Sequence, residues 1–147
     1  MGFLLDTGIL LRLLDRADPH HADIRQALRR LRLRGDTLVT SAQNMAEFWN
    51  VCTRPASARG GYGLPVAETQ RRLRLLERLF VVLTEIPAAY PLWRNLVVAH
   101  AVQGVQAHDA RLVALMQAHG IAHILTLNGA DFARYPGVVA FEPTAVP

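Results

Sequence analysis

The chain has 147 residues, of which 51% are hydrophobic and 19% are charged. This composition is typical of a folded globular protein and excludes an intrinsically disordered one. The only cysteine is Cys52, which excludes an intrachain disulfide and any zinc site built on cysteine pairs. The length fits one domain over residues 1–147, with a proline-containing tail at 142–147 that we expect to be frayed.

The formal net charge is +4, and all 16 basic residues are arginine. The absence of lysine excludes a P-loop, because that motif uses a lysine to bind phosphate. Arginine binds phosphate through paired hydrogen bonds and stacks on bases. The charge is therefore compatible with a nucleic-acid partner.

No run of apolar residues approaches the roughly 20 that span a bilayer. A signal peptide has a basic segment before its apolar stretch, and the N-terminus of this chain has none. We therefore expect no signal peptide, no membrane contact and a cytoplasmic location.

Hydrophobic periodicity and turn residues predict alternating strands and helices in the first half of the chain. Ser41 is a suitable N-cap for the third of these helices. In chain order we expect a strand at 3–5, a helix from near residue 7, a helix at 20–34, a strand at 37–40, a helix after Ser41 that ends before Pro55, a glycine- and proline-rich loop at 54–65, and a helix at 65–79.

The same alternation continues to the C-terminus. We expect a strand at 80–83, a helix from Pro87 to about Gln103, a helix from 107 or 108 to 118, a strand at 122–126, a turn at 128–132 and a short strand at 138–141. This order favours an α/β fold: a three-layer α/β/α sandwich around a mostly parallel sheet of four to five strands.

Four acidic residues lie where such a fold brings carboxylates together. Asp6 directly follows the first strand, Glu47 lies within two turns of the start of the helix after the second, and Asp131 lies just past the fourth. Ligand sites of parallel sheets lie beyond the carboxyl ends of the strands, so these three side chains can converge. Asp109 precedes its strand, so the long helix before it must return to the same edge.

Carboxylates that gather in one site raise each other's pKa and require a cation. Hard oxygen ligands select Mg²⁺ or Mn²⁺. Each acid also has an ordinary explanation on its own: Asp6 and Asp131 as caps, Glu47 as a solvated helix residue, and Asp109 as a first-turn acid favoured by the helix dipole. These explanations are much weaker when they must all hold together.

The phrases around the four acids resemble the motifs of PIN-domain ribonucleases, and most closely those of VapC-type toxins of toxin–antitoxin pairs. The resemblance spans about residues 3–140 and rests on residues 4–10, 46–48, 108–114 and 126–132, followed by 136–138; the third phrase is the most specific. Many relatives carry asparagine after the Asp-Thr pair. This chain has Gly8 there, which cannot support Asp6 with a side chain.

The resemblance implies a Mg²⁺-dependent endoribonuclease, with Mn²⁺ able to substitute, that leaves a 3′-hydroxyl and a 5′-phosphate. Asp6 and Asp109 would be the metal ligands, and Glu47 and Asp131 would complete the catalytic set. The metal ion would activate the attacking water and offset charge on the phosphate. We expect hydrogen bonds to this site from Thr7, Thr126 and Asn128.

The resemblance further implies an RNA substrate, a cognate antitoxin that lies across the acidic cleft, and a homodimer. Apolar residues near 24–31 or 49–52 would be available for the dimer contact. The protein would thus be the toxin of a type II toxin–antitoxin system.

Two other functions remain open. A non-catalytic PIN module that binds RNA or a partner protein would not need four intact acids. A phosphatase on a similar fold generally carries a second aspartate two residues after the first, where this chain has Gly8, and no lysine is present to complete such a site.

Overall fold

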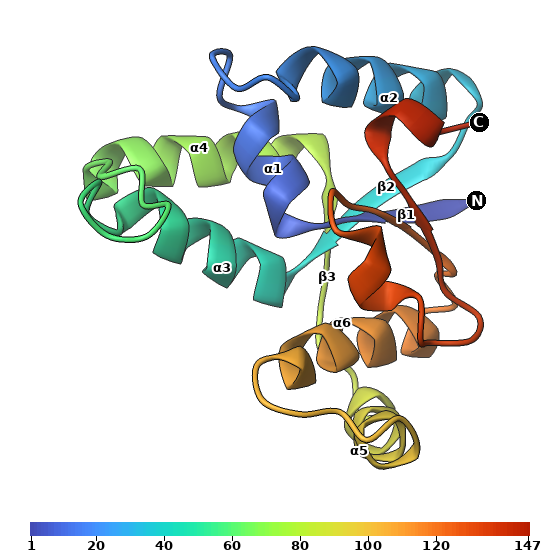
Figure 1. Ribbon diagram of the computed structural model, residues 1–147. Helices are drawn as coiled ribbons and strands as arrows, with labels where there is room; N and C mark the ends of the chain where they lie inside the picture. Colours follow the sequence, from blue (N-terminus) through green and yellow to red (C-terminus); the bar gives the residue numbers. More distant parts are fainter.

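The protein is built on one five-stranded sheet whose strands all run in the same direction. The computed structural model describes all 147 residues. The strand order is β3-β2-β1-β4-β5, and every neighbouring pair is parallel. The strands are β1 (Gly2–Leu5), β2 (Thr37–Ser41), β3 (Val81–Leu83), β4 (His123–Leu125) and β5 (Val139–Phe141). Their carboxyl ends therefore meet at one edge, and the expected parallel sheet of four to five strands is confirmed (Figure 1).

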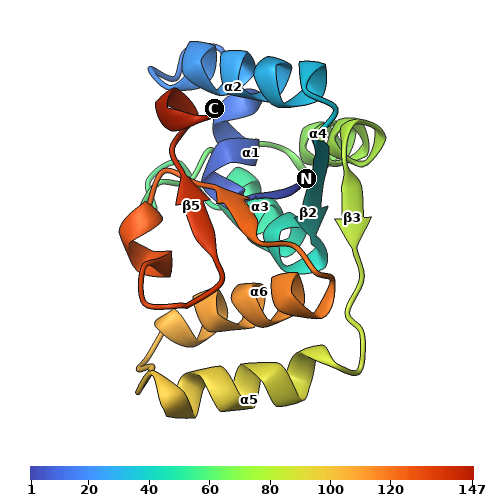
Figure 2. The ribbon, with the colours of Figure 1, turned by 90° about the vertical axis from the view of Figure 1, so that its right-hand side faces the viewer.

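Six α-helices cover the two faces of the sheet. They are α1 (Thr7–Leu13), α2 (His21–Leu33), α3 (Ala42–Thr53), α4 (Val66–Leu79), α5 (Ala89–Ala99) and α6 (Gln106–Ala118), with short 3-10 helices η1 (Gly129–Phe132) and η2 (Pro143–Ala145). Figure 2 shows α5 and α6 on one side of the sheet and α1, α2 and α4 on the other. The expected three-layer α/β/α sandwich is confirmed.

Each face of the sheet has its own hydrophobic core. Phe3 and Leu5 of β1 point into the core formed with α1, α2, α3 and α4, whereas Leu4 points into the core formed with α5 and α6. This alternation follows from the two-residue period of a strand. β1 is thus fixed from both sides, and so is the residue that follows it.

Two turns at the carboxyl edge are fixed by capping bonds. Ser41 Oγ accepts a hydrogen bond from the backbone N–H of Asn44 at 3.1 Å, which confirms Ser41 as the N-cap of α3. Asp6 caps α1, and its backbone N–H donates to the carbonyl oxygen of Leu125 at 3.1 Å. The chain after β1 is therefore tied to the end of β4.

The structure corrects two expected element boundaries. The helix expected from Pro87 to Gln103 ends at Ala99, because Ala101 takes a positive φ of 48° and the chain turns there. The tail at 142–147 is not frayed: it forms η2, and Val146 is 5% exposed in the core beside α2. Arg34 also donates to the carbonyl oxygen of Pro147 at 3.0 Å.

The expected dimer surface is wrong for residues 24–31. Its four apolar side chains are all buried in the core: Ile24, Ala27, Leu28 and Leu31. Cys52, in the second expected stretch, is buried as well. By contrast, α5 buries only Ala89 and leaves Tyr90 and Val98 exposed.

None of the helices combines the length and the apolar character that crossing a bilayer requires.

Two leucines of α2 provide a matched test of the core. Leu31 is fully buried and Leu33 is 79% exposed. We expect Leu31→Ala to lower the free energy of unfolding by about 2–5 kcal/mol, because it leaves a cavity. We expect Leu33→Ala to change it by less than about 0.5 kcal/mol. Urea unfolding followed by circular dichroism measures both, and equal effects would contradict the packing of α2.

Candidate active site

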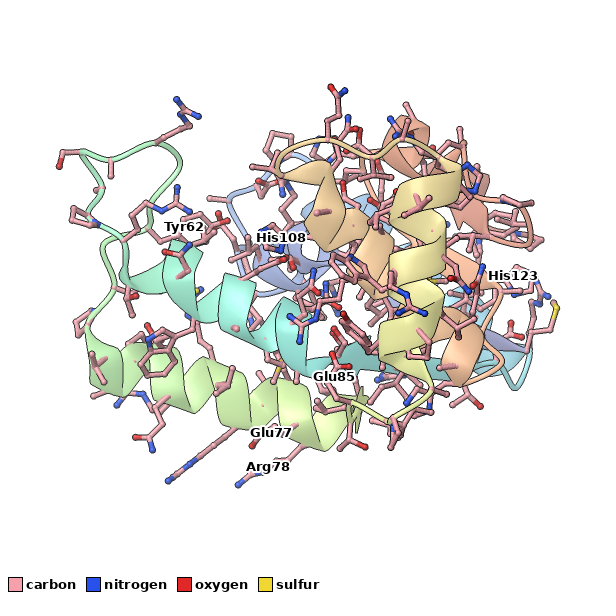
Figure 3. All side chains as sticks on the ribbon, turned by 90° about the horizontal axis from the view of Figure 1, so that it is seen from below. Tyr62, Glu77, Arg78, Glu85, His108 and His123 are labelled. Carbon is pink, nitrogen blue, oxygen red and sulfur yellow. The ribbon has the colours of Figure 1, made fainter.

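The structure brings all four predicted acids to the carboxyl edge of the sheet. Asp6 leaves β1, Glu47 lies on α3, Asp109 lies in the first turn of α6 and Asp131 lies in η1. Besides burial, which is the largest cause, the charges of the other three acids raise the pKa of Asp109, and those of Glu47 and Asp131 raise the pKa of Asp6. These mutual effects show that the four acids lie near one another. Figure 3 shows the start of α6, marked by His108, beside α3.

The Asp6 carboxylate is held by three donors from three elements. Its Oδ1 accepts hydrogen bonds from the backbone N–H of Thr7 at 2.8 Å and from Asn44 Nδ2 at 3.4 Å. Its Oδ2 accepts one from the hydroxyl of Thr126 at 2.7 Å. Both oxygens are thus oriented as acceptors by groups from α1, α3 and the end of β4.

Glu47 is anchored through both of its carboxylate oxygens. Oε2 accepts a hydrogen bond from the hydroxyl of Thr7 at 2.6 Å, and Oε1 accepts one from Gln43 Nε2 at 3.1 Å. Gln43 Nε2 also donates to the carbonyl oxygen of His108 at 2.9 Å. Gln43 therefore joins the helix that carries Glu47 to the helix turn that carries Asp109.

Asp131 is presented by a turn that is bonded to the same threonine as Asp6. The backbone N–H of Asn128 donates to Thr126 Oγ1, and the backbone N–H of Asp131 donates to the carbonyl oxygen of Asn128, both at 3.1 Å. Thr126 is fully buried. Of the expected donors, Thr7 and Thr126 contact the acids through side chains, whereas Asn128 contributes its backbone.

Two residues of the site were missed in the sequence, Gln43 and Asn44. A signal for Asn44 exists: it is on the same helical stripe as the buried residues Phe48 and Cys52, and a polar side chain among apolar ones needs a buried partner. Gly8 cannot support Asp6 with a side chain, but the amide of Asn44 bonds Asp6 from the neighbouring helix α3.

Burial and mutual repulsion disfavour the ionised form of two of the acids. Burial is the largest cause of the raised pKa of Asp6, and hydrogen bonds from Thr126 and Thr7 partly offset it. Burial and the charges of Asp131, Asp6 and Glu47 raise the pKa of Asp109 to about 6. A cation at this edge would favour the ionised form of both.

The donor groups fit a hard divalent cation, because they are carboxylate and hydroxyl oxygens. No three His, Cys, Asp or Glu side chains lie close enough together to form a complete ligand set.

The acidic edge is an open surface rather than a cavity. None of the four cavities in the protein is lined by the acids, and the largest, about 670 Å³, lies between α2 and α4. Small-molecule sites are usually enclosed. An open edge gives access to a polymer.

The fold and the four acids define a class of protein. A sequence model described as the PIN domain matches residues 3–138, and the chain belongs to the PIN-domain family. No curated protein matches the chain in sequence.

Solved toxin–antitoxin structures are similar in fold. A chain of VapBC-1 from nontypeable Haemophilus influenzae is 20% identical, with a TM-score of 0.72 over 98% of this chain and 99% of that one. A chain of VapBC2 from Rickettsia felis, bound to a promoter DNA fragment, is 15% identical with a TM-score of 0.72 over 97% and 98%. Mycobacterium tuberculosis VapC20, a sarcin-ricin loop cleaving toxin, is 18% identical with a TM-score of 0.61 over 89% and 93%.

Because the pKa of Asp109 is raised, replacing this acid by a neutral residue should stabilise the protein by an amount that depends on pH. Between about pH 3.8 and 6 the folded protein holds a proton on Asp109 that the unfolded chain releases. The stability of the metal-free protein therefore falls as pH rises through this window. We expect Asp109→Asn to raise the melting temperature at pH 7.5, with the gain vanishing towards pH 4. Thermal unfolding in chelator measures this, and a gain independent of pH would contradict it.

Proposed function

We propose that the protein is a Mg²⁺-dependent endoribonuclease that hydrolyses RNA phosphodiester bonds, and that it is the toxin of a type II toxin–antitoxin system. The observation that carries the proposal is the convergence of Asp6, Glu47, Asp109 and Asp131 at one edge of a PIN domain. PIN nucleases generally use divalent metals. The description of the similar VapC20 as a sarcin-ricin loop cleaving toxin supports an RNA substrate.

In this proposal Asp6 and Asp109 hold Mg²⁺, or Mn²⁺ in its place, and Glu47 and Asp131 complete the catalytic set. When bound, the metal ion supplies an activated water and offsets charge on the scissile phosphate. Thr126 keeps Asp6 Oδ2 oriented, and Thr7 keeps Glu47 oriented. The backbone bonds from Asn128 keep Asp131 at the rim, where it meets the RNA strand.

The proposed partners are RNA, a cognate antitoxin and a second copy of the chain. Similar solved structures are toxin–antitoxin complexes, which supports the antitoxin. The exposed apolar side chains of α5 support the homodimer. We further propose that residues 1–147 act as one PIN domain, and that the RNA substrate places it in the cytoplasm.

Loss of either proposed metal ligand should abolish cleavage. We expect Asp6→Asn and Asp109→Asn each to slow cleavage of total RNA by about 100-fold or more, because the metal site loses a charged ligand. Excess chelator should do the same to the wild type. Asp23→Asn removes an exposed acid of α2 and should leave the rate unchanged. Mapping of 5′ ends measures the products.

Full activity in excess chelator would contradict the metal mechanism. Binding of RNA without cleavage in Mg²⁺, by a folded wild type, would instead support the non-catalytic binding module.

The homodimer has a separate test on α5. We expect light scattering to give a mass near twice 16.3 kDa for the wild type. Val98 is 77% exposed, and Val98→Glu should shift the mass towards the monomer without unfolding the protein. The matched control is Leu33→Glu on α2, at a side chain 79% exposed, which should leave the mass unchanged. A monomeric wild type at high concentration would refute the dimer.

A further inference from the structure

A buried chain of hydrogen bonds runs from the end of β2 to the acids. Ser41 Oγ donates to Asn44 Oδ1 at 2.6 Å, and Asn44 Nδ2 donates to Thr7 Oγ1 at 3.1 Å. Thr7 Oγ1 then donates to Glu47 Oε2 at 2.6 Å. Ser41 and Asn44 are fully buried and Thr7 is 8% exposed. The bond between Ser41 and Asn44 is therefore shielded from water, and the chain of bonds reaches solvent only near Glu47.

The Glu47 carboxylate fixes the direction in which these hydrogen bonds are donated. An ionised carboxylate can only accept, so the single proton of the Thr7 hydroxyl goes to Glu47. Thr7 must then accept from Asn44, which requires the amide nitrogen of Asn44 to face the acids. The reversed amide would set its oxygen against Asp6 Oδ1, which now lies 3.4 Å from the nitrogen. One orientation of one amide satisfies every partner.

We propose that Asn44 is a positioning residue that aligns Asp6 and Glu47 for a divalent cation, an inference that rests on the proposed nuclease function. Asp6 Oδ2 accepts a single bond, from Thr126, and each oxygen of Glu47 accepts a single bond. Each of these oxygens keeps a free lone pair. Asn44 leaves those lone pairs free because it directs its protons to Asp6 Oδ1 and to Thr7.

The only side-chain amide bonded to Asp6 comes from α3, because position 8 of α1 has no side chain that could supply one. Position 8 is glycine, and a Cβ added there would lie 3.2 Å from Arg12 Nη1. Asn44 and Glu47 are three residues apart on α3 and share a helix face. A single helix thus carries one of the acids and the amide that aligns another acid.

The test compares the affinity of the variants for Mn²⁺, which electron paramagnetic resonance measures. The measurements are made at a temperature where circular dichroism shows that each variant is folded. Asn44→Leu keeps the approximate shape and removes the amide. We expect it to weaken Mn²⁺ binding about 10-fold or more. Ser41→Ala keeps the amide but removes the hydroxyl that orients it, together with the N-cap bond of α3. We expect it to weaken Mn²⁺ binding to a smaller extent, and it tests the proposal if Asn44→Leu does not fold.

A matched control is Thr69→Val on α4. Thr69 is also fully buried, and its hydroxyl bonds the carbonyl oxygen of Pro65 at 3.1 Å, away from the acids. This variant should lose stability and keep its Mn²⁺ affinity. If Asn44→Leu and Ser41→Ala behave like Thr69→Val, the amide has a structural role only and the proposal is overturned.

A double-mutant cycle tests whether Asn44 acts through Thr7. We expect the Asn44→Leu/Thr7→Val double variant to bind Mn²⁺ within about twofold of the weaker single variant, because residues in one network are not additive. Fully additive losses of Mn²⁺ affinity would contradict a hydrogen-bond path from Asn44 through Thr7.

A metal-free readout separates this proposal from the nuclease function. The side-chain amide protons of Asn44 should exchange slowly with solvent in ¹⁵N NMR spectra of the wild type, and faster in Ser41→Ala. Rapid exchange in the wild type would overturn the proposal. A wild type that neither binds Mn²⁺ nor cleaves RNA would refute the nuclease function instead, while the exchange rates still decide whether the amide is held.

Discussion

Repulsion among four carboxylates at one sheet edge is the constraint on which the rest of the site depends. Burial is the largest cause of the raised pKa of Asp6 and of Asp109, and this repulsion raises both further. All the hydrogen bonds that hold Asp6 and Glu47 come from neutral donors, which belong to Thr7, Gln43, Asn44 and Thr126. Neutral donors orient carboxylates without cancelling their charge. The edge therefore keeps a strong preference for a cation while its geometry is already set.

The position of three acids could be predicted from local sequence, because Asp6 and Asp131 follow strands and Glu47 lies early in a helix. Asp109 could not be placed by spacing alone. Its location depends on the return of α6 along α5, which is fixed by packing and by the bond from Trp93 Nε1 to the carbonyl oxygen of Ala107 at 2.9 Å. Such a contact between two helices leaves no local pattern, so the family resemblance had to supply it.

The features of the site and of the tail that the sequence did not reveal depend on contacts between distant segments. Asn44 bonds Thr7 across 37 positions, and Gln43 bonds His108 across 65. The C-terminal tail was expected to be frayed because its own composition is that of a loop. It is ordered because Val146 fills space in the core beside α2. The helix that periodicity predicted at 20–34 was correct. Periodicity does not say, however, whether an apolar stripe faces the protein's own core or a partner.

Both ends of the chain lie towards the amino ends of the strands, away from the carboxyl edge (Figure 1). The amino group of Met1 pairs with Asp36 at 3.0 Å, beside β2, and the carbonyl oxygen of Pro147 is bound by Arg34. A purification tag or a fluorescent fusion at either end would thus point away from the four acids. Removal of Val146, in contrast, would open the core beneath α2, so residues 143–147 should be retained in any shortened version used for crystallisation.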